Sequence, residues 1–267
     1  MGALRRVGVI AGYEWRRALA KKKILALIIL AVAFQTLVMV GEHALFAEGF
    51  FTTEVSLIWI TGVVEGGLFV ELIAIIVGGG SMSEEYEHGT ADILLSKPIK
   101  RVEYMSGKFL GGFSLLAMVE ALITFVGVVL SLAFFGAQSG LQFAPIMFLA
   151  IVYSSLIFFC LSFMFSEVFR GTTLAILLAF AIYIASSVIS PILTFLYGTS
   201  ARALPTWAAT EFLSLVMSEL ITGSSVLPAG DLGALAQASL IIAVYAIVFT
   251  LIAAYRLLKS DVTKKTD

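Results

Sequence analysis

The sequence predicts an all-α membrane protein with six transmembrane helices, and three observations support this prediction. Hydrophobic residues make up 60% of the 267 residues and charged residues 13%, whereas soluble domains carry about 25% charged residues. Several stretches of about 20 residues contain almost no charge, which is the length that an α-helix needs to cross a bilayer. The Lys and Arg residues gather in connections that would all lie on one side of the membrane.

The composition excludes several classes of protein. The net charge of −1 gives no overall basic field for binding nucleic acid, and a chain this apolar does not stay disordered. A single cysteine, Cys160, permits neither an intrachain disulfide nor a cysteine-based zinc site. His43 and His88 are the only histidines. The sequence therefore predicts no metal site, and we assign no catalytic or cofactor-binding residues.

Six apolar runs give the expected spans, which are residues 24–40, 57–80, 109–135, 143–165, 172–197 and 235–257. The stretch between Ala121 and Ser166 carries no charge but is too long for one helix, and the turn-forming residues 136–142 divide it. Pro191 predicts a kink in the fifth span. We expect one transmembrane domain over residues 1–267, with both termini on the same side.

The basic residues predict which side this is. Lys and Arg are enriched in short cytoplasmic loops, and Arg202 is the only one of the 17 Lys and Arg residues that falls on the opposite side in the six-span arrangement. Both termini are therefore expected in the cytoplasm, in a multi-pass protein of the cell membrane (plasma or inner membrane).

Residues 1–23 predict an amphipathic helix in the plane of the lipid headgroups. Its apolar side consists of Leu4, Val7, Ala11, Trp15 and Ala18. Its basic side consists of Arg5, Arg6, Arg16 and Arg17. This helix either contacts anionic lipid or a cytoplasmic partner, or only anchors the chain. The run 24–40 is longer than the roughly 7–15 apolar residues of a secretory signal, which favours an uncleaved anchor.

The longest extracytoplasmic segment is expected at 199–231. A polar stripe predicts a short interfacial helix there, formed by Glu211, Ser214, Ser218 and Thr222. Phe212, Val216 and Leu220 project from its other face. This helix either covers the outer end of a substrate path or only seals helix ends against water.

The connection between the second and third spans, residues 81–108, is longer than the two to eight residues that a helix–helix turn needs. Ser81 and Glu84 have the spacing of a capping box. Ile93, Leu94 and Leu95 then supply apolar side chains before Pro98 ends the helix. This pattern is typical of a helix that docks against another protein.

The same connection resembles that of a known family. Glu84-Glu85-x-Glu87-x-Gly89-Thr90, then Leu94-Leu95, Pro98, Arg101 and Gly107-Lys108 are similar to the pattern in permeases of the type-2 ABC exporter family, a relative being the permease of the nitrous-oxide-reductase maturation system. The resemblance extends over the whole chain, with six spans, a basic N-terminal helix and a long outer segment before the last span.

The resemblance implies the membrane subunit of an ABC transporter. Such permeases pair with a second copy or a close paralogue and bind two separate ATPase subunits, which hold ATP and Mg²⁺, so no cofactor is expected in this chain. Residues 83–96 would form the coupling helix between spans two and three. The expected ATPase-docking residues are Glu84, Glu85, Glu87, Gly89, Thr90, Leu94, Leu95, Pro98 and Arg101. The chain itself carries no G-x-x-x-x-G-K-[ST] motif, and we expect it not to be an enzyme.

Two other functions stay open at this point. One is a membrane anchor that uses ATPase motion to act on an extracytoplasmic partner without transport. The other is a stand-alone ion-coupled carrier, since carboxylates inside spans often mark ion pathways, and Glu65, Glu71 and Glu120 lie in spans. Glu71 and Glu120 are expected near the bilayer midplane, where they either fix helix packing or line a translocation path.

Overall fold

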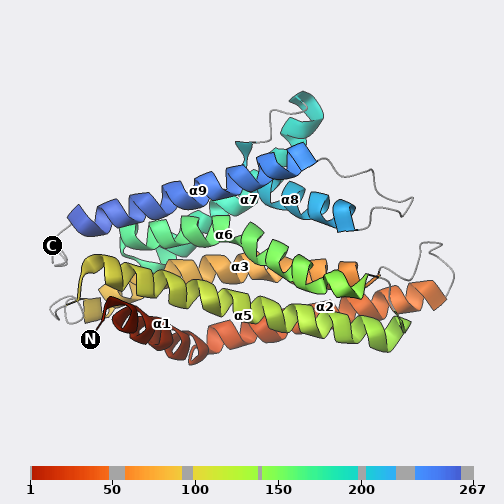
Figure 1. The fold of residues 1–267 in the computed structure, drawn as a ribbon, viewed down its shortest axis with the longest axis horizontal. Helices are drawn as coiled ribbons and strands as arrows, with labels where there is room; N and C mark the ends of the chain where they lie inside the picture. Colours follow the sequence, from red (N-terminus) through yellow and green to blue (C-terminus); the bar gives the residue numbers. More distant parts are fainter. Residues whose placement is uncertain are drawn as a thin grey trace.

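The computed structural model describes residues 2–47, 58–91, 99–137, 140–197, 203–220 and 232–259. The described elements are α1 (Ala3–Leu19), α2 (Lys22–Ala47), α3 (Ile58–Glu87), α5 (Arg101–Phe135), the 3₁₀ turn η2 (Leu141–Phe143), α6 (Ala144–Phe169), α7 (Thr172–Tyr197), α8 (Pro205–Leu220) and α9 (Leu232–Lys259). The long helices run side by side along the longest axis of the molecule, and α1 lies at the same end as the last turns of α9 (Figure 1). The all-α prediction is confirmed for these residues.

Five helices in the described part of the chain are long and apolar enough to cross a membrane. They cover Ile24–Leu45, Arg101–Phe135, Leu141–Phe169, Thr172–Leu193 and Leu232–Lys259. With 30 residues, α3 is of similar length but is not among the five, so the sixth span stays a prediction. Side chains that face away from the bundle on α7 and α9 are large and apolar, as expected for contact with lipid. They include Leu177, Leu240 and Leu251.

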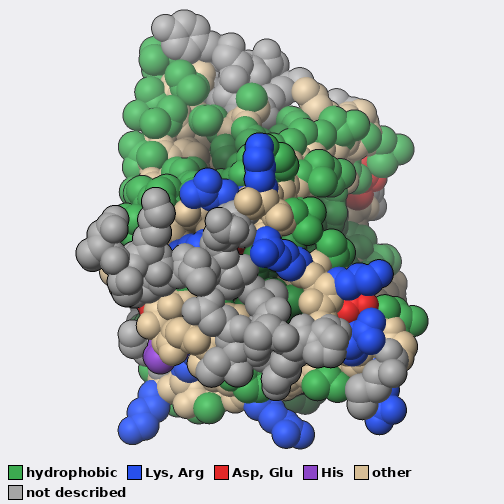
Figure 2. Space-filling view, turned by 90° about the vertical axis from the view of Figure 1, so that its left-hand side faces the viewer, with side chains coloured by type: hydrophobic (Ala, Val, Ile, Leu, Met, Phe, Trp, Pro, Cys, Tyr) green, Lys and Arg blue, Asp and Glu red, His purple; other side chains and the backbone are tan. Residues whose placement is uncertain are grey.

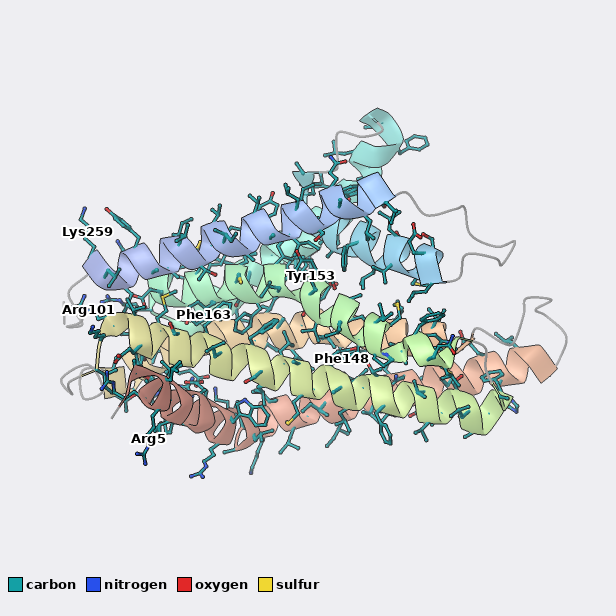
Figure 3. The ribbon with its side chains drawn as sticks, viewed as in Figure 1. Arg5, Arg101, Phe148, Tyr153, Phe163 and Lys259 are labelled. Atoms are coloured by element: carbon teal, nitrogen blue, oxygen red, sulfur yellow. The ribbon has the colours of Figure 1, made fainter. Side chains whose placement is uncertain are left out.

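The central helix is α3, which makes its most extensive contacts with α6 and α5. A Cβ atom on Gly78 would lie 2.6 Å from the Phe159 carbonyl oxygen, and one on Gly79 would lie 2.7 Å from Ser162 Oγ. Small residues at these positions let the two backbones approach closely, which is how membrane helices commonly pack. Phe159 and the nearby Phe163 (Figure 3) are fully buried in this layer.

The structure corrects the expected start of the helix at 83–96. Residues from Ser81 to Glu87 are the last turns of α3, and the Ser83 hydroxyl donates to the Gly79 carbonyl within that helix. The capping-box interpretation of Ser81 and Glu84 is therefore wrong. The first charged residues after an apolar run therefore do not mark the end of the helix, because α3 continues through Glu84 and Glu85 to Glu87.

The helix α8 lies against the bundle, in contact with α9 and α6. Phe212 packs on Tyr153 of α6, with ring centroids 5.1 Å apart. Ser218 and Val216 are both buried, so the expected division into a polar and an apolar face does not hold at Ser218. Thr222 lies outside the described residues.

Candidate functional site

Basic side chains gather at one end of the bundle, which we call the basic end. It comprises α1, the last turns of α3, α6 and α9, and the first turns of α5. Figure 2 looks onto this end and shows many Lys and Arg side chains and few acidic ones. Arg5, Arg101 and Lys259 all lie there (Figure 3).

Three buried charges connect three helices at the basic end. The ammonium group of Lys108 on α5 bonds the carboxylates of Glu14 on α1 and Glu85 on α3. The three side chains are 0%, 5% and 2% exposed. The buried Tyr104 hydroxyl, one turn before Lys108, also donates to Glu85. Buried charges are tolerated when they are paired in this way, because a lone charge loses its hydration without compensation.

Two further cations surround this centre. Arg17 donates to Glu14 at 2.8 Å and lies 3.4 Å from Glu85, and Lys21 lies 2.5 Å from Glu84. We call Glu14, Arg17, Lys21, Glu84, Glu85 and Lys108 the ionic cluster, in which three cations face three acids. Burial raises the pKa of Glu14, and the charges of Lys108 and Arg17 oppose that rise.

Two glycines bring α1 close enough for this pairing. A Cβ atom on Gly107 would lie 2.6 Å from Ile10 Cβ, and one on Gly111 would lie 2.9 Å from Ala11 Cα. The two glycines are one turn apart on α5 and form a G-x-x-x-G face of the kind that packs helices at short range. The N-terminal helix is therefore docked on α5, and Arg17 points into the protein instead of toward lipid headgroups.

The end of α3 is also connected to α6 and α7. Glu87 accepts hydrogen bonds from the Thr172 backbone N–H at 2.7 Å and from its hydroxyl at 2.9 Å, at the first residue of α7. A carboxylate is favourable there because the N-terminus of a helix is electropositive. Tyr86 donates to Glu167 of α6 at 2.8 Å, and burial raises the pKa of Tyr86, which keeps the phenol protonated as the donor.

Two arginines connect α5 to α9 and to α1. Arg101, in the first turn of α5, donates to the carbonyl oxygens of Leu257 and Leu258 at 2.8 and 3.2 Å, and these carbonyls belong to the last turns of α9. Arg6 pairs with Glu103 at 2.7 Å. Charged side chains therefore join α1, α5 and α9 at the basic end.

A turn follows α3. Gly89 has a φ of +67°, which glycine adopts without the steric penalty that other residues incur, and the Thr90 hydroxyl donates to the Glu85 carbonyl at 3.3 Å. The chain is helical again at Thr90 and Ala91. Leu94, Leu95 and Pro98 lie outside the described residues.

Six of the nine sequence-predicted docking residues lie in the described part of the chain, and they divide into two groups. Glu84, Glu85, Glu87 and Arg101 are engaged with other helices of this chain. Gly89 lies in the turn that follows α3, and Thr90 begins the helical residues after it.

The glutamates inside the bundle have different neighbours. Glu71 of α3 accepts a hydrogen bond from Tyr183 of α7. Glu120 of α5 is fully buried and accepts a 2.9 Å bond from Thr124 on its own helix. The two carboxyl groups therefore bind separate partners, although the sequence places them at a similar depth. The side chain of Glu65 lies outside the described part of the structure.

A comparison with protein families identifies the chain. The model of the ABC-2 family transporter proteins matches residues 9–262, which is nearly the whole sequence. The chain belongs to the ABC-2 transporter family. A search among curated proteins finds no match. As an ABC-2 permease, the chain is a membrane component of an ABC transporter, and its family implies an ABC-type ATPase partner.

Sequence reasoning about this ABC-2 permease assigned no role to Glu14 and none to Lys108 beyond its place in the family pattern, although both carry a local signal. Glu14 shares a helical face with Val7, Ala11 and Ala18, which places an acid in the middle of the apolar side. Lys108 lies between Gly107 and Gly111, whose spacing predicts a close helix contact. A charged residue on a packing face indicates a buried partner.

Proposed function

We propose that this ABC-2 permease is the membrane-spanning half of an exporter that forms a dimer and binds two ATPase subunits. The proposed arrangement has six spans, α2, α3, α5, α6, α7 and α9, with the basic end in the cytoplasm. The concentration of Lys and Arg at this end supports the orientation (Figure 2), and the central position of α3 supports its inclusion among the spans.

The ionic cluster is the observation that carries the proposal. It joins the last turns of α3 to α1 and α5 through buried charges, so that a force applied at the end of α3 reaches three helices at once. The turn at Gly89 lies immediately beyond the cluster. We infer that the segment after Gly89 contacts the ATPase, and that Glu84, Glu85 and Glu87 transmit its movement instead of binding the ATPase directly.

This division of labour predicts the effect of changing the docking segment. Replacing Leu94 and Leu95 with Asp removes ATPase binding, because burying each leucine at an interface contributes about 1.5–3 kcal/mol and a buried carboxylate opposes binding further. The measurement is the ATP hydrolysis that co-purifies with the tagged chain from membranes of its source cell.

The matched control is Leu258→Asp, which places the same charge on an exposed position at the basic end, where Leu258 is 55% exposed. This variant should retain the co-purified ATP hydrolysis. If the double Asp variant retains as much ATPase as Leu258→Asp, the segment after Gly89 does not dock the ATPase.

A further inference from the structure

Two adjacent hollows lie beside α8. This helix packs toward the end of the bundle opposite the basic end (Figure 1). The inner cavity has a volume of about 240 Å³ and is lined by residues of α3, α6, α7 and α8. The outer cleft has a volume of about 600 Å³ and lies between α7 and α8. Ser187, Thr206 and Thr210 line both, so the two hollows are adjacent and share part of their walls.

The hydroxyl groups of this site present oxygen lone pairs to the interior. Four of them already donate their hydrogen to a backbone carbonyl three or four residues earlier in their own helix, at 2.8–2.9 Å; these are Ser154, Ser187, Thr210 and Ser214. A hydroxyl that has donated its hydrogen can still accept hydrogen bonds. The walls therefore favour a ligand that donates hydrogen bonds.

Thr206 gives an independent indication of a ligand. Its side chain is 5% exposed and lines both hollows, and its hydroxyl oxygen has no hydrogen-bond partner among the described residues. A buried polar group without a partner costs about 1–3 kcal/mol. A hydrogen-bonding ligand in the cavity would supply the missing partner.

The acidic side chains of the site favour a cationic ligand. Glu71 lines the inner cavity and Glu211 the outer cleft, and the described residues that line either hollow include no Lys, Arg or His. Within the described ranges, no group of three His, Cys, Asp or Glu side chains comes together, which disfavours a divalent metal ion because such an ion takes several of these ligands.

The remaining walls are apolar and aromatic, and Trp207 and Phe195 flank the outer cleft. Aromatic faces attract organic cations, and a mixture of apolar walls with a few polar groups is typical of sites for small organic molecules. We propose that the cavity and the cleft form one binding site for amphiphilic organic cations, whose ammonium group binds among Glu71, Glu211 and the hydroxyl oxygens.

The test uses the full-length chain in phosphatidylcholine nanodiscs, without any ATPase, so that it is independent of the proposed function. The probe is 2-phenylethylammonium, and 3-phenylpropan-1-ol serves as an uncharged analogue of similar size. Isothermal titration, with empty nanodiscs as the blank, should give saturable binding of the amine and at least tenfold weaker binding of the alcohol.

Variants assign the binding to this site. Glu71→Gln and Glu211→Gln should each weaken amine binding about tenfold, whereas Glu219→Gln should leave it unchanged, because Glu219 is on α8 but lines neither hollow. Thr206→Val keeps the shape of the side chain and removes an unpartnered hydroxyl. It should therefore fold with an unchanged or higher midpoint of thermal unfolding and bind the amine several-fold more weakly.

Three results would overturn the proposal. The first is the absence of saturable amine binding up to about 10 mM, a concentration well above the dissociation constants of ordinary sites. The second is equal binding of the amine and the alcohol. The third is unchanged amine binding by Thr206→Val together with either Gln variant, once size-exclusion chromatography shows that these variants are folded.

Discussion

Lys108 shows at the scale of one residue how burial fixes the role of a charge. Its ammonium group has no exposure to solvent, and it contacts carboxylates from two other helices. Both acids are almost fully buried and also contact Arg17, so Lys108 is one of the two cations that compensate their loss of hydration. The three charges therefore stabilise the native arrangement only as a set.

Replacing Lys108 with Met should destabilise the protein by about 3–5 kcal/mol, the usual effect of removing one partner from a buried ion pair. Methionine has a side chain of similar length, so the loss of stability is due to the removal of the positive charge. The measurement is the midpoint of thermal unfolding in detergent, followed by intrinsic fluorescence.

Arg5→Met is the matched control, because Arg5 is an exposed cation of α1 at the same end. Its unfolding midpoint should stay close to that of the wild type. A Lys108→Met protein as stable as Arg5→Met would show that the cluster contributes little.

At the scale of one element, the N-terminal helix is held by shape as well as by charge. A Cβ atom on Gly111 would lie 2.7 Å from Glu14 Cβ, so any larger residue pushes α1 away from α5. Gly12, by contrast, has no atom within 4 Å of such a Cβ position.

Gly111→Val should therefore displace α1 and expose its Arg16–Arg17 peptide to trypsin, because proteases cleave segments that open locally. Overpacking of this kind costs about 1–3 kcal/mol. The measurement is the rate of cleavage in nanodiscs, and Gly12→Val should be cleaved as slowly as the wild type. Equal cleavage rates for the two variants would contradict the docked position of α1.

The sequence predicted where the helices lie better than it predicted the residues at which they begin and end. Charge-free runs predict the helices because the hydrocarbon core excludes charged side chains. The boundary at Ser81 was wrong because an acid inside the last turns of a helix has the same local pattern as one that begins a helix. The partners of Lys108 are 94 and 23 residues away, and no local pattern specifies contacts at those separations.

At the scale of the whole molecule, the main prediction is the orientation of the helix bundle in the membrane. Cys160 is buried and is the only cysteine, so a Cys160→Ala background permits labelling at single new positions. Leu4→Cys lies at the basic end and Ala203→Cys precedes α8, and both positions are exposed.

A membrane-impermeant maleimide applied to intact cells should label Ala203→Cys and should leave Leu4→Cys unlabelled until the membrane is opened. This outcome follows from the positive-inside rule, which predicts that the basic end lies in the cytoplasm. The reverse pattern would place the basic end outside, and labelling of both positions would argue against a single orientation.

The charge balance of the ionic cluster has a consequence for how the chain is made. All six of its residues lie between Glu14 and Lys108, so the set is complete once the first two-fifths of the chain has left the ribosome. In the finished protein Glu14 pairs with Arg17 and Lys108. Before Lys108 has been synthesised, Arg17 is the only one of these two partners present. We therefore expect the N-terminal helix to pack against α5 only after Lys108 has been synthesised. The later helices would then join an N-terminal part in which the ionic cluster is already complete.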